Sequence, residues 1–480
     1  MSVLLLSLMF SLHWINIFQL TSIDTYGITM GDACAVSMIL FALYKWIWLG
    51  QPLTFIPGWI STLFFLILLS EYTSIINPIL SASTTMQMQF LKTSTNFLYK
   101  WLFALVFITG VFTEKDAKKA CVFILYFSVF INVFGVYQMF ARAFNLPFAW
   151  IEINNVTVGL RNNISMDGLK QLSLNFDNFF RATSLFSESS ILGHFNALII
   201  SLITVPYITQ KPQLISSNIR IITILILSLV GMLVAFSLTG ITILVMVLLY
   251  IVFIEQSGRK SMLGIVSGIF GGLLICIDRI IDSILNTSII ELFIMRFGGI
   301  YNVLSTSGGG SSSIQGESFF SRMETSMQGI SAWFENPITG LGAGCLFSYS
   351  KTDSIPYTDA LYSGLIGELG LFGFMVFFIF VILLYSKVIS LSKTYAASLS
   401  YDTDFILSLS PYFLILMAGY GLSGYSWITF DHWTYLGFVC LAIISVYKQK
   451  SLPLTEYYLV DVSLKDKMIL FLNNSEKNKQ

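Results

Sequence analysis

Residues 362–386 read YSGLIGELGLFGFMVFFIFVILLYS, and Glu368 is the one charged residue among them. An α-helix needs about 20 mainly apolar residues to cross the hydrocarbon core of a bilayer. Inside that core a helix satisfies its own backbone hydrogen bonds, which an open loop cannot do. This stretch therefore predicts a membrane-spanning helix, and it sets the class of fold for the rest of the chain.

The whole chain has the composition of a membrane protein. Of its 480 residues, 55% are hydrophobic and 11% are charged, whereas charged residues make up about 25% of a soluble domain. The 26 basic and 26 acidic residues balance, so no nucleic-acid partner is expected. Five cysteines stand singly along the chain, which predicts neither a disulfide framework nor a metal site. We expect no cofactor.

Apolar stretches of spanning length predict an all-α polytopic membrane protein with about 12 transmembrane helices and two long external loops. The first stretch has no basic region or cleavage site, so we expect it to be retained as a span. The expected spans lie near 3–21, 29–48, 54–77, 95–113, 119–140, 190–209, 220–237, 239–255, 262–281, 362–386, 405–425 and 429–447.

The distribution of lysine and arginine predicts the orientation of these spans. Basic residues near span ends are retained in the cytoplasm. With both termini inside, every short basic gap falls on the cytoplasmic face and the two long gaps fall outside. The expected regions are an N-terminal bundle (1–140), a first external loop (141–189), central spans (190–281), a second external loop (282–361), C-terminal spans (362–447) and a cytoplasmic tail (448–480).

The first long loop supplies several candidates for a functional site. Arg181 precedes a span, where its guanidinium could bind a lipid-borne phosphate or snorkel to water. Glu188 is either the N-cap of the next helix or a site carboxylate. His194 lies one turn inside that helix, where a histidine more often packs than acts as a base. Arg161 is a further candidate for substrate binding.

The second long loop contains an expected helix, from Glu317 to the stop at Asn336 and Pro337. Arg322 lies along the edge of its apolar face, either beside a ligand or in water. The following run PITGLGAG (337–344) allows close approach of backbone to backbone or to a ligand. Arg296, earlier in this loop, is added as a substrate-binding candidate.

Ionisable groups near or within spans are further candidates, because such positions are costly. Asp359 stands at the mouth of a span and Glu368 within it; the rival roles are helix capping and a bond to a neighbouring helix. Asp431 and His432, in TFDHW (429–433), are a site pair or an interfacial anchor. Asp402 and Asp404 form a D-x-D on the expected cytoplasmic face, which we interpret as a solvated loop.

Four motifs occur in a characteristic order. They are FFRATSLFSE (179–188), FSLTG (236–240), WFENPITGLGAG (333–344) and DALYSGLIGELGLFG (359–373). In this order they resemble the bacterial O-antigen polymerase and ligase family, which includes capsule and exopolysaccharide repeat-unit polymerases. The resemblance covers roughly residues 175–385.

The resemblance implies metal-independent glycosyl transfer on the outer face of the bacterial cytoplasmic (inner) membrane. The substrate would be an oligosaccharide repeat unit on polyprenyl (undecaprenyl) pyrophosphate, built into O-antigen of lipopolysaccharide, capsule or exopolysaccharide. Arg181 and Arg322 match loop arginines that engage this substrate. A chain-length regulator and membrane lipids would be partners.

The chain also departs from the family pattern. Ligases carry a histidine near the last loop, where this chain has Thr358, Asp359 and Ala360, which favours a polymerase and makes Asp359 a candidate base. The predicted catalytic residues are thus Asp359, Glu188 and Arg322, and the predicted substrate-binding residues are Arg181, Arg322, Arg161, Arg296, Glu368 and His432. The alternatives are an O-antigen ligase and, from another class, a lipid-linked glycan flippase.

Overall fold

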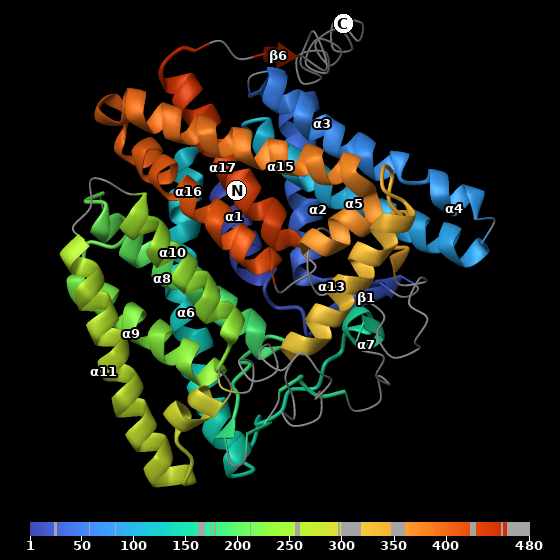
Figure 1. The fold of residues 1–480 in the computed structure, drawn as a ribbon. Helices are drawn as coiled ribbons and strands as arrows, with labels where there is room; N and C mark the ends of the chain where they lie inside the picture. The colour runs from blue at the N-terminus through green and yellow to red at the C-terminus, as the bar shows by residue number, and fades with distance from the viewer. Residues whose placement is uncertain are drawn as a thin grey trace, which may run out of the picture.

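The computed structural model is mostly helical (Figure 1). It describes residues 1–23, 26–56, 58–81, 83–161, 169–173, 175–176, 179–211, 213–254, 260–295, 298, 318–346, 361–422, 429–452 and 455–457, and for 159–161, 175–176, 260–263, 265–266, 318–324 and 455–457 it describes the backbone alone. The larger helices are α1 (Ser2–Leu12), α2 (Met30–Leu43), α3 (Gly58–Thr73), α5 (Thr84–Ile108), α6 (Glu114–Ala143), α8 (Ser189–Ile208), α9 (Asn218–Ala235), α10 (Leu238–Phe253), α11 (Lys260–Leu285), α13 (Ser318–Glu335), α15 (Leu361–Tyr395), α16 (Tyr401–Gly421) and α17 (Phe430–Gln449).

Short elements connect these helices. The helical ones are a π-helical turn that continues α2 (Tyr44–Trp48), α4 (Ile76–Leu80), α7 (Val156–Arg161) and a 3₁₀ turn after α15 (Ala396–Ser398). Three two-stranded antiparallel sheets pair β1 (Gln19–Ile23) with β2 (Tyr26–Thr29), β3 (Leu53–Phe55) with β6 (Thr455–Tyr457), and β4 (Asn175–Phe176) with β5 (Phe179–Phe180).

Eight helices within the described residues are long and apolar enough to cross a membrane. Two further apolar helices, α1 and α10, are shorter, and α5 and α11 lie outside the set of eight although the sequence predicted spans there. The membrane class is therefore confirmed, whereas the expected count of 12 spans is not. The eight are Met30–Trp48, Gly58–Leu80, Glu114–Ala143, Ser189–Ile208, Asn218–Ala235, Leu361–Ser398, Tyr401–Gly421 and Phe430–Gln449.

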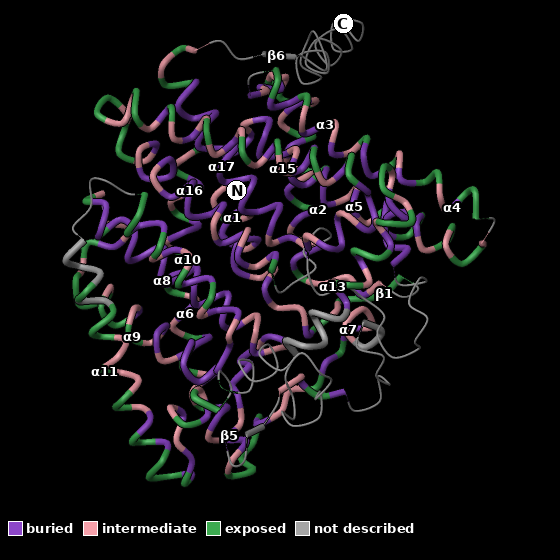
Figure 2. The backbone as a smooth tube through the Cα atoms, viewed as in Figure 1, coloured by how far each residue is buried: buried purple, intermediate pink, exposed green. Residues whose placement is uncertain are grey.

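The centre of the bundle is formed by α8, α16 and α17, which bury most of their residues. Outer helices such as α3 and α9 carry exposed large apolar residues instead, and Figure 2 shows exposed segments along both. An exposed apolar surface of this extent marks contact with a membrane or another protein. The arrangement is that of a bundle whose outer helices face lipid.

The expected first span, 3–21, is wrong in its second half. Helix α1 ends at Leu12, and Gln19 and Leu20 belong to strand β1. Strand β1 pairs with β2 directly after it, and both strands also bond to a distant segment: the Gln19 amide donates to the Asn154 carbonyl, and the Gly27 amide in β2 donates to Thr157. These partners could not be identified from the apolar pattern of residues 3–21 alone.

The glycine-rich run after α13 packs backbone against backbone. Helix α15 is broken at Gly370, whose φ is +65°, and the loop from Pro337 to Gly342 bonds to the freed groups. The Leu341 amide donates to the Gly367 carbonyl at 2.8 Å and the Leu371 amide to the Pro337 carbonyl at 2.9 Å. The expected helix at 317–335 is confirmed as α13, and its glycine-rich continuation is a structural clamp on α15.

One end of the bundle collects lysines and their partners, and we call it the lysine face. Lys118 pairs with Asp402 at 2.6 Å and Lys211 with Asp404 at 2.8 Å, and Lys450 bonds to the Ser398 carbonyl. The expectation that Asp402 and Asp404 lie in a solvated loop is therefore wrong. Both residues lie in the first turn of α16, where the helix dipole and two lysines stabilise their negative charge.

Candidate functional site

A polar cavity of about 210 Å³ lies away from the lysine face. Helix α1 approaches it with the residues that follow its last turn, α2 and α17 with their first turns, and α5 with its middle. The hairpin β1–β2 and the segment around Asn155 close another side. Two larger hollows, of about 810 and 660 Å³, are lined mostly by apolar side chains, whereas this smaller cavity has charged and titratable side chains in its lining.

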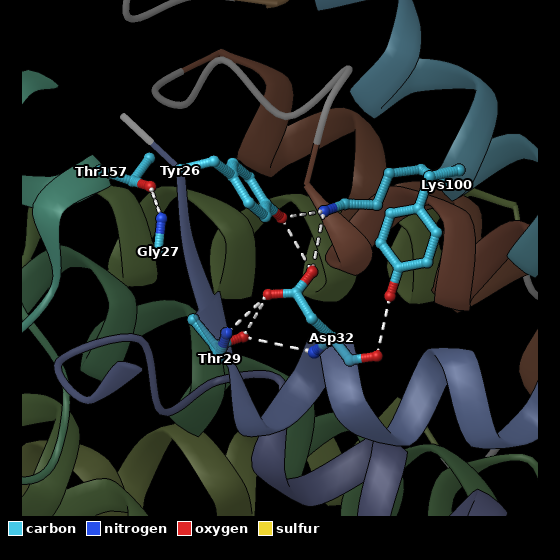
Figure 3. Close-up of polar contacts among 7 residues, drawn as sticks. Tyr26, Gly27, Thr29, Asp32, Lys100 and Thr157 are labelled. Carbon is cyan, nitrogen blue, oxygen red and sulfur yellow. Dashed lines mark hydrogen bonds and ion pairs between the residues drawn. The ribbon is translucent and has the colours of Figure 1, made fainter. Parts of the chain in front are cut away.

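A buried ion pair stands on one wall of the cavity (Figure 3). The Lys100 ammonium lies 3.7 Å from Asp32 Oδ1, and both side chains are almost fully buried. The Tyr26 hydroxyl donates to the same Asp32 oxygen at 2.8 Å and accepts from Lys100 at 3.2 Å. The ammonium also lies 3.9 Å from the centre of the Phe430 ring, a cation–π contact that further compensates its lost hydration.

The local sequence fixes Asp32 in this position. Thr29 and Asp32 form a capping box at the start of α2, in which each side chain accepts from the other residue's backbone amide. This leaves Asp32 Oδ1 for Tyr26 and Lys100, since Oδ2 serves the cap. Burial and the Asp32 carboxylate raise the pKa of Tyr26 above its ordinary value, so its phenol keeps its proton and acts as a donor.

A second pair, His13 and Asp431, stands on another wall. His13 Nε2 lies 3.2 Å from Asp431 Oδ1, with the imidazole 1% exposed and the carboxylate 14% exposed. His13 Nδ1 lies 2.7 Å from the Met9 carbonyl oxygen, and a carbonyl can only accept, so Nδ1 carries a proton. The other ring nitrogen, Nε2, faces the carboxylate, and both members of the pair line the cavity.

All three histidines of the chain gather at this place. The His194 ring stacks on Tyr420 with 4.2 Å between centroids, and its Nε2 lies 3.1 Å from the Tyr435 hydroxyl. The Trp14 ring, next to His13, lies 4.9 Å from that of His194, and the ring of His432 lies 6.0 Å from that of Tyr420. With three histidines in 480 residues, their meeting beside one carboxylate marks the place as chemically distinct.

The loop residues predicted from the sequence lie apart from the cavity. Arg181 is buried and its Nε donates to the Ala235 carbonyl at 3.1 Å. Its own carbonyl accepts from Arg142, a buried arginine that also bonds to Gln171 and Thr183 at 3.0 and 2.8 Å. Glu188 is the N-cap residue of α8 and accepts from Ser190. None of these residues lines the cavity.

The remaining predicted residues are placed less completely. Glu368 is buried in α15 beside the break at Gly370, and His432 is buried next to Asp431. Arg161 and Arg322 lie in α7 and α13, where their side chains are not described. Asp359 and Arg296 lie outside the described residues. The roles predicted for these residues remain predictions.

Sequence reasoning missed the residues that line the cavity, apart from Asp431. Asp32 and Lys100 each lie inside an expected span, where an ionisable group is a functional candidate by default. That signal was present in the sequence and could have found both. His13 carried the same signal, because it lies in the middle of the expected span 3–21.

The fold and this cavity define a polytopic helical membrane protein with a polar site enclosed by its helices. Within the described residues, no group of three or more His, Cys, Asp or Glu side chains is arranged to hold a metal ion. The chain matches no protein-family model and no curated protein sequence.

Proposed function

We propose that this protein is a membrane glycosyltransferase that polymerises oligosaccharide repeat units carried on polyprenyl pyrophosphate. Three lines of support converge on this proposal. The ordered motifs of residues 175–385 resemble the O-antigen polymerase family, the chain has helices long and apolar enough to span a membrane, and the ends of several of these helices line a polar cavity. The observation that carries the proposal is the Asp431–His13 pair in that cavity.

Glycosyl transfer of this kind replaces one bond at the anomeric carbon with another and moves one proton. An acceptor hydroxyl oxygen attacks the anomeric carbon of the donor sugar, the bond from that carbon to pyrophosphate breaks, and the hydroxyl proton passes to a base. We assign the base to Asp431, because its carboxylate reaches the cavity and His13 holds it in place. Removal of a positioned base typically lowers a rate by about 10²–10⁴-fold.

The departing pyrophosphate needs fixed cations in a site from which water is excluded. The loop arginines, Arg181, Arg322, Arg161 and Arg296, are our candidates for this role. Glu188 and Asp359, predicted from the sequence as catalytic residues, stay candidates for that role, and Glu368 stays a candidate for substrate binding. We also propose that the transfer needs no metal ion.

Lipid analysis of cells that lack the protein tests this function. We expect single repeat units to accumulate on polyprenyl pyrophosphate at the outer face of the membrane, and long chains to disappear. Asp431→Asn and His13→Gln should fail to restore long chains at normal protein levels, whereas Asp402→Asn, on the lysine face, should restore them. Full-length polymer left on its lipid carrier would instead indicate a ligase.

A transporter of lipid-linked glycan is the second candidate, and one observation favours it. Glu71, Arg142 and Glu368 are buried within helices that could span the membrane, and buried ionisable groups at such positions often mark transport pathways. This function predicts a different lipid distribution: repeat units would be trapped on the inner leaflet of cells that lack the protein.

A further inference from the structure

We infer that the cavity binds a neutral sugar ring of the acceptor and that the donor pyrophosphate binds elsewhere. This inference rests on the proposed function for the identity of the ligands. It places the acceptor sugar and the donor pyrophosphate at two different sites. The charge, the hydrogen-bonding groups and the size of the cavity support it.

The charged side chains that line the cavity lie in pairs. Lys100 is paired with Asp32, and Asp431 is paired with His13. Neither Arg142 nor Arg181 is among the lining residues. A pyrophosphate would thus meet two carboxylates and one lysine that is already paired, and desolvating an anion without a free cation is unfavourable. A neutral ligand meets no such penalty.

The cavity offers hydrogen-bonding groups suited to hydroxyls. Trp14 Nε1, a donor on a residue that is 2% exposed, has no hydrogen-bond partner within the described part of the chain, and neither has the buried acceptor Asn96 Oδ1. Buried polar atoms normally have partners. A sugar hydroxyl both donates and accepts, so it can partner either kind of atom, whereas a pyrophosphate, which lacks donors, cannot serve Asn96 Oδ1.

Further polar and aromatic groups surround these two atoms. Asn16, Asn155 and Thr157 add amide and hydroxyl groups, and Tyr420 and Phe430 add ring surface. Amphipathic aromatic rings can cover the apolar C–H face of a sugar while their polar neighbours serve its hydroxyls. The lining therefore has the mixed character of a carbohydrate site.

The size of the cavity limits the ligand. Its volume is about 210 Å³, whereas pockets for drug-sized ligands measure about 300–1,000 Å³. A single ring fits this space better than a whole repeat unit. The terminal ring of an acceptor chain would then place one hydroxyl against Asp431, with the rest of the chain outside.

Binding to the purified full-length protein in nanodiscs tests this inference without any turnover. The probes are methyl glycosides of common hexoses and N-acetylhexosamines, with inorganic pyrophosphate as the competing probe, and the readout is saturation-transfer NMR. We expect at least one glycoside to bind and an equal concentration of pyrophosphate to leave its signal unchanged. Asn96→Leu should weaken glycoside binding by about tenfold, as loss of one hydrogen bond in a buried site can.

The matched control is Asn218→Leu, which removes an exposed amide at the start of α9 and should leave glycoside binding unchanged. Displacement of the glycoside by pyrophosphate would overturn the inference, as would equal binding to wild type and Asn96→Leu or no binding of any glycoside. The binding assay needs no lipid-linked substrate, so it tests the sugar site separately from the proposed function. If cells that lack the protein still made normal long chains, the proposed function would be refuted, while glycoside binding to the purified protein would still support the sugar site.

Discussion

At the scale of the residue, the cavity depends on charges that are buried in pairs. Removing one partner from such a pair leaves the other uncompensated and typically costs about 3–5 kcal/mol. We therefore expect Lys100→Met to lower the midpoint of thermal unfolding in detergent strongly, because Asp32 stays buried. Adding Asp32→Asn should recover most of the loss, since the amide oxygen can still cap α2.

The double variant is what separates charge from packing in this test. If Lys100→Met destabilises the protein by removing the packing of its long side chain, the added Asp32→Asn will bring no recovery. A Lys100→Met protein as stable as wild type would contradict the compensated pair, and with it the charge argument for a neutral ligand.

A second residue gives a prediction for pH. Burial, with Glu368 and Glu71 nearby, raises the pKa of the Cys345 thiol from 9.0 to about 12. Between these values the folded protein keeps a proton that the unfolded chain gives up, so the free energy of unfolding falls as pH rises. The slope is at most about 1.4 kcal/mol per pH unit.

Cys345→Ala should make the decline in stability above pH 9 less steep, as measured by chemical denaturation at a series of pH values. The control is Cys276→Ala, which changes an exposed cysteine and should leave the decline as it is in wild type. Identical slopes for wild type and Cys345→Ala would show that the thiol ionises alike in both states.

At the scale of the element, the break in α15 depends on Gly370. Its φ is +65°, and a Cβ atom there would lie 2.3 Å from the Ile338 carbonyl oxygen. We expect Gly370→Ala to prevent accumulation of folded protein, because both the backbone conformation and the contact forbid a side chain. Gly271→Ala is the matched control: a Cβ there meets nothing within 4 Å, and alanine favours the helix by about 0.5–1 kcal/mol.

Fluorescence-detected size-exclusion chromatography of membrane extracts measures both glycine variants. A monodisperse peak for Gly370→Ala at the wild-type level would show that the clamp between α13 and α15 tolerates a side chain. A loss of the peak for Gly271→Ala, in α11, would show instead that an added methyl group is harmful even where it meets no neighbouring atom.

The elements that the sequence predicted well are those whose signals are local. The helix ending at Glu335 follows from its periodicity and from Pro337, and its end was predicted correctly. The hairpin β1–β2 was not predicted, because the apolar run 3–21 favoured one continuous span over a strand at Gln19–Ile23. Its contacts with Asn154 and Thr157, more than 100 residues away, have no signal in the local sequence. The same limit applies to the cavity: His13, Asp32, Lys100 and Asp431 come from four separate parts of the chain, and no spacing in the sequence brings them together.

At the scale of the whole molecule, the lysine face and the cavity lie toward different ends of the helices. In α17, Asp431 is in the first turn and Lys448 in the last. Ser2, at the start of α1, bonds to Asp116 close to Lys118, whereas His13 follows the last turn of the same helix. The sequence predicted that basic gaps share a face, and Lys118, Lys211 and Lys450 from three of these gaps do lie at one end, whereas Lys100 lies in the cavity.

Retention of lysines in the cytoplasm then predicts the orientation of the protein. In a background without the native cysteines, we expect a membrane-impermeant maleimide to label Ser22→Cys, in the exposed hairpin, from outside spheroplasts. Ser398→Cys, exposed on the lysine face, should react after the membrane is opened and not before. The reverse pattern would place the cavity toward the cytoplasm, where nucleotide-linked rather than polyprenyl-linked sugars are the common donors, and would remove the basis for an outer-face polymerase.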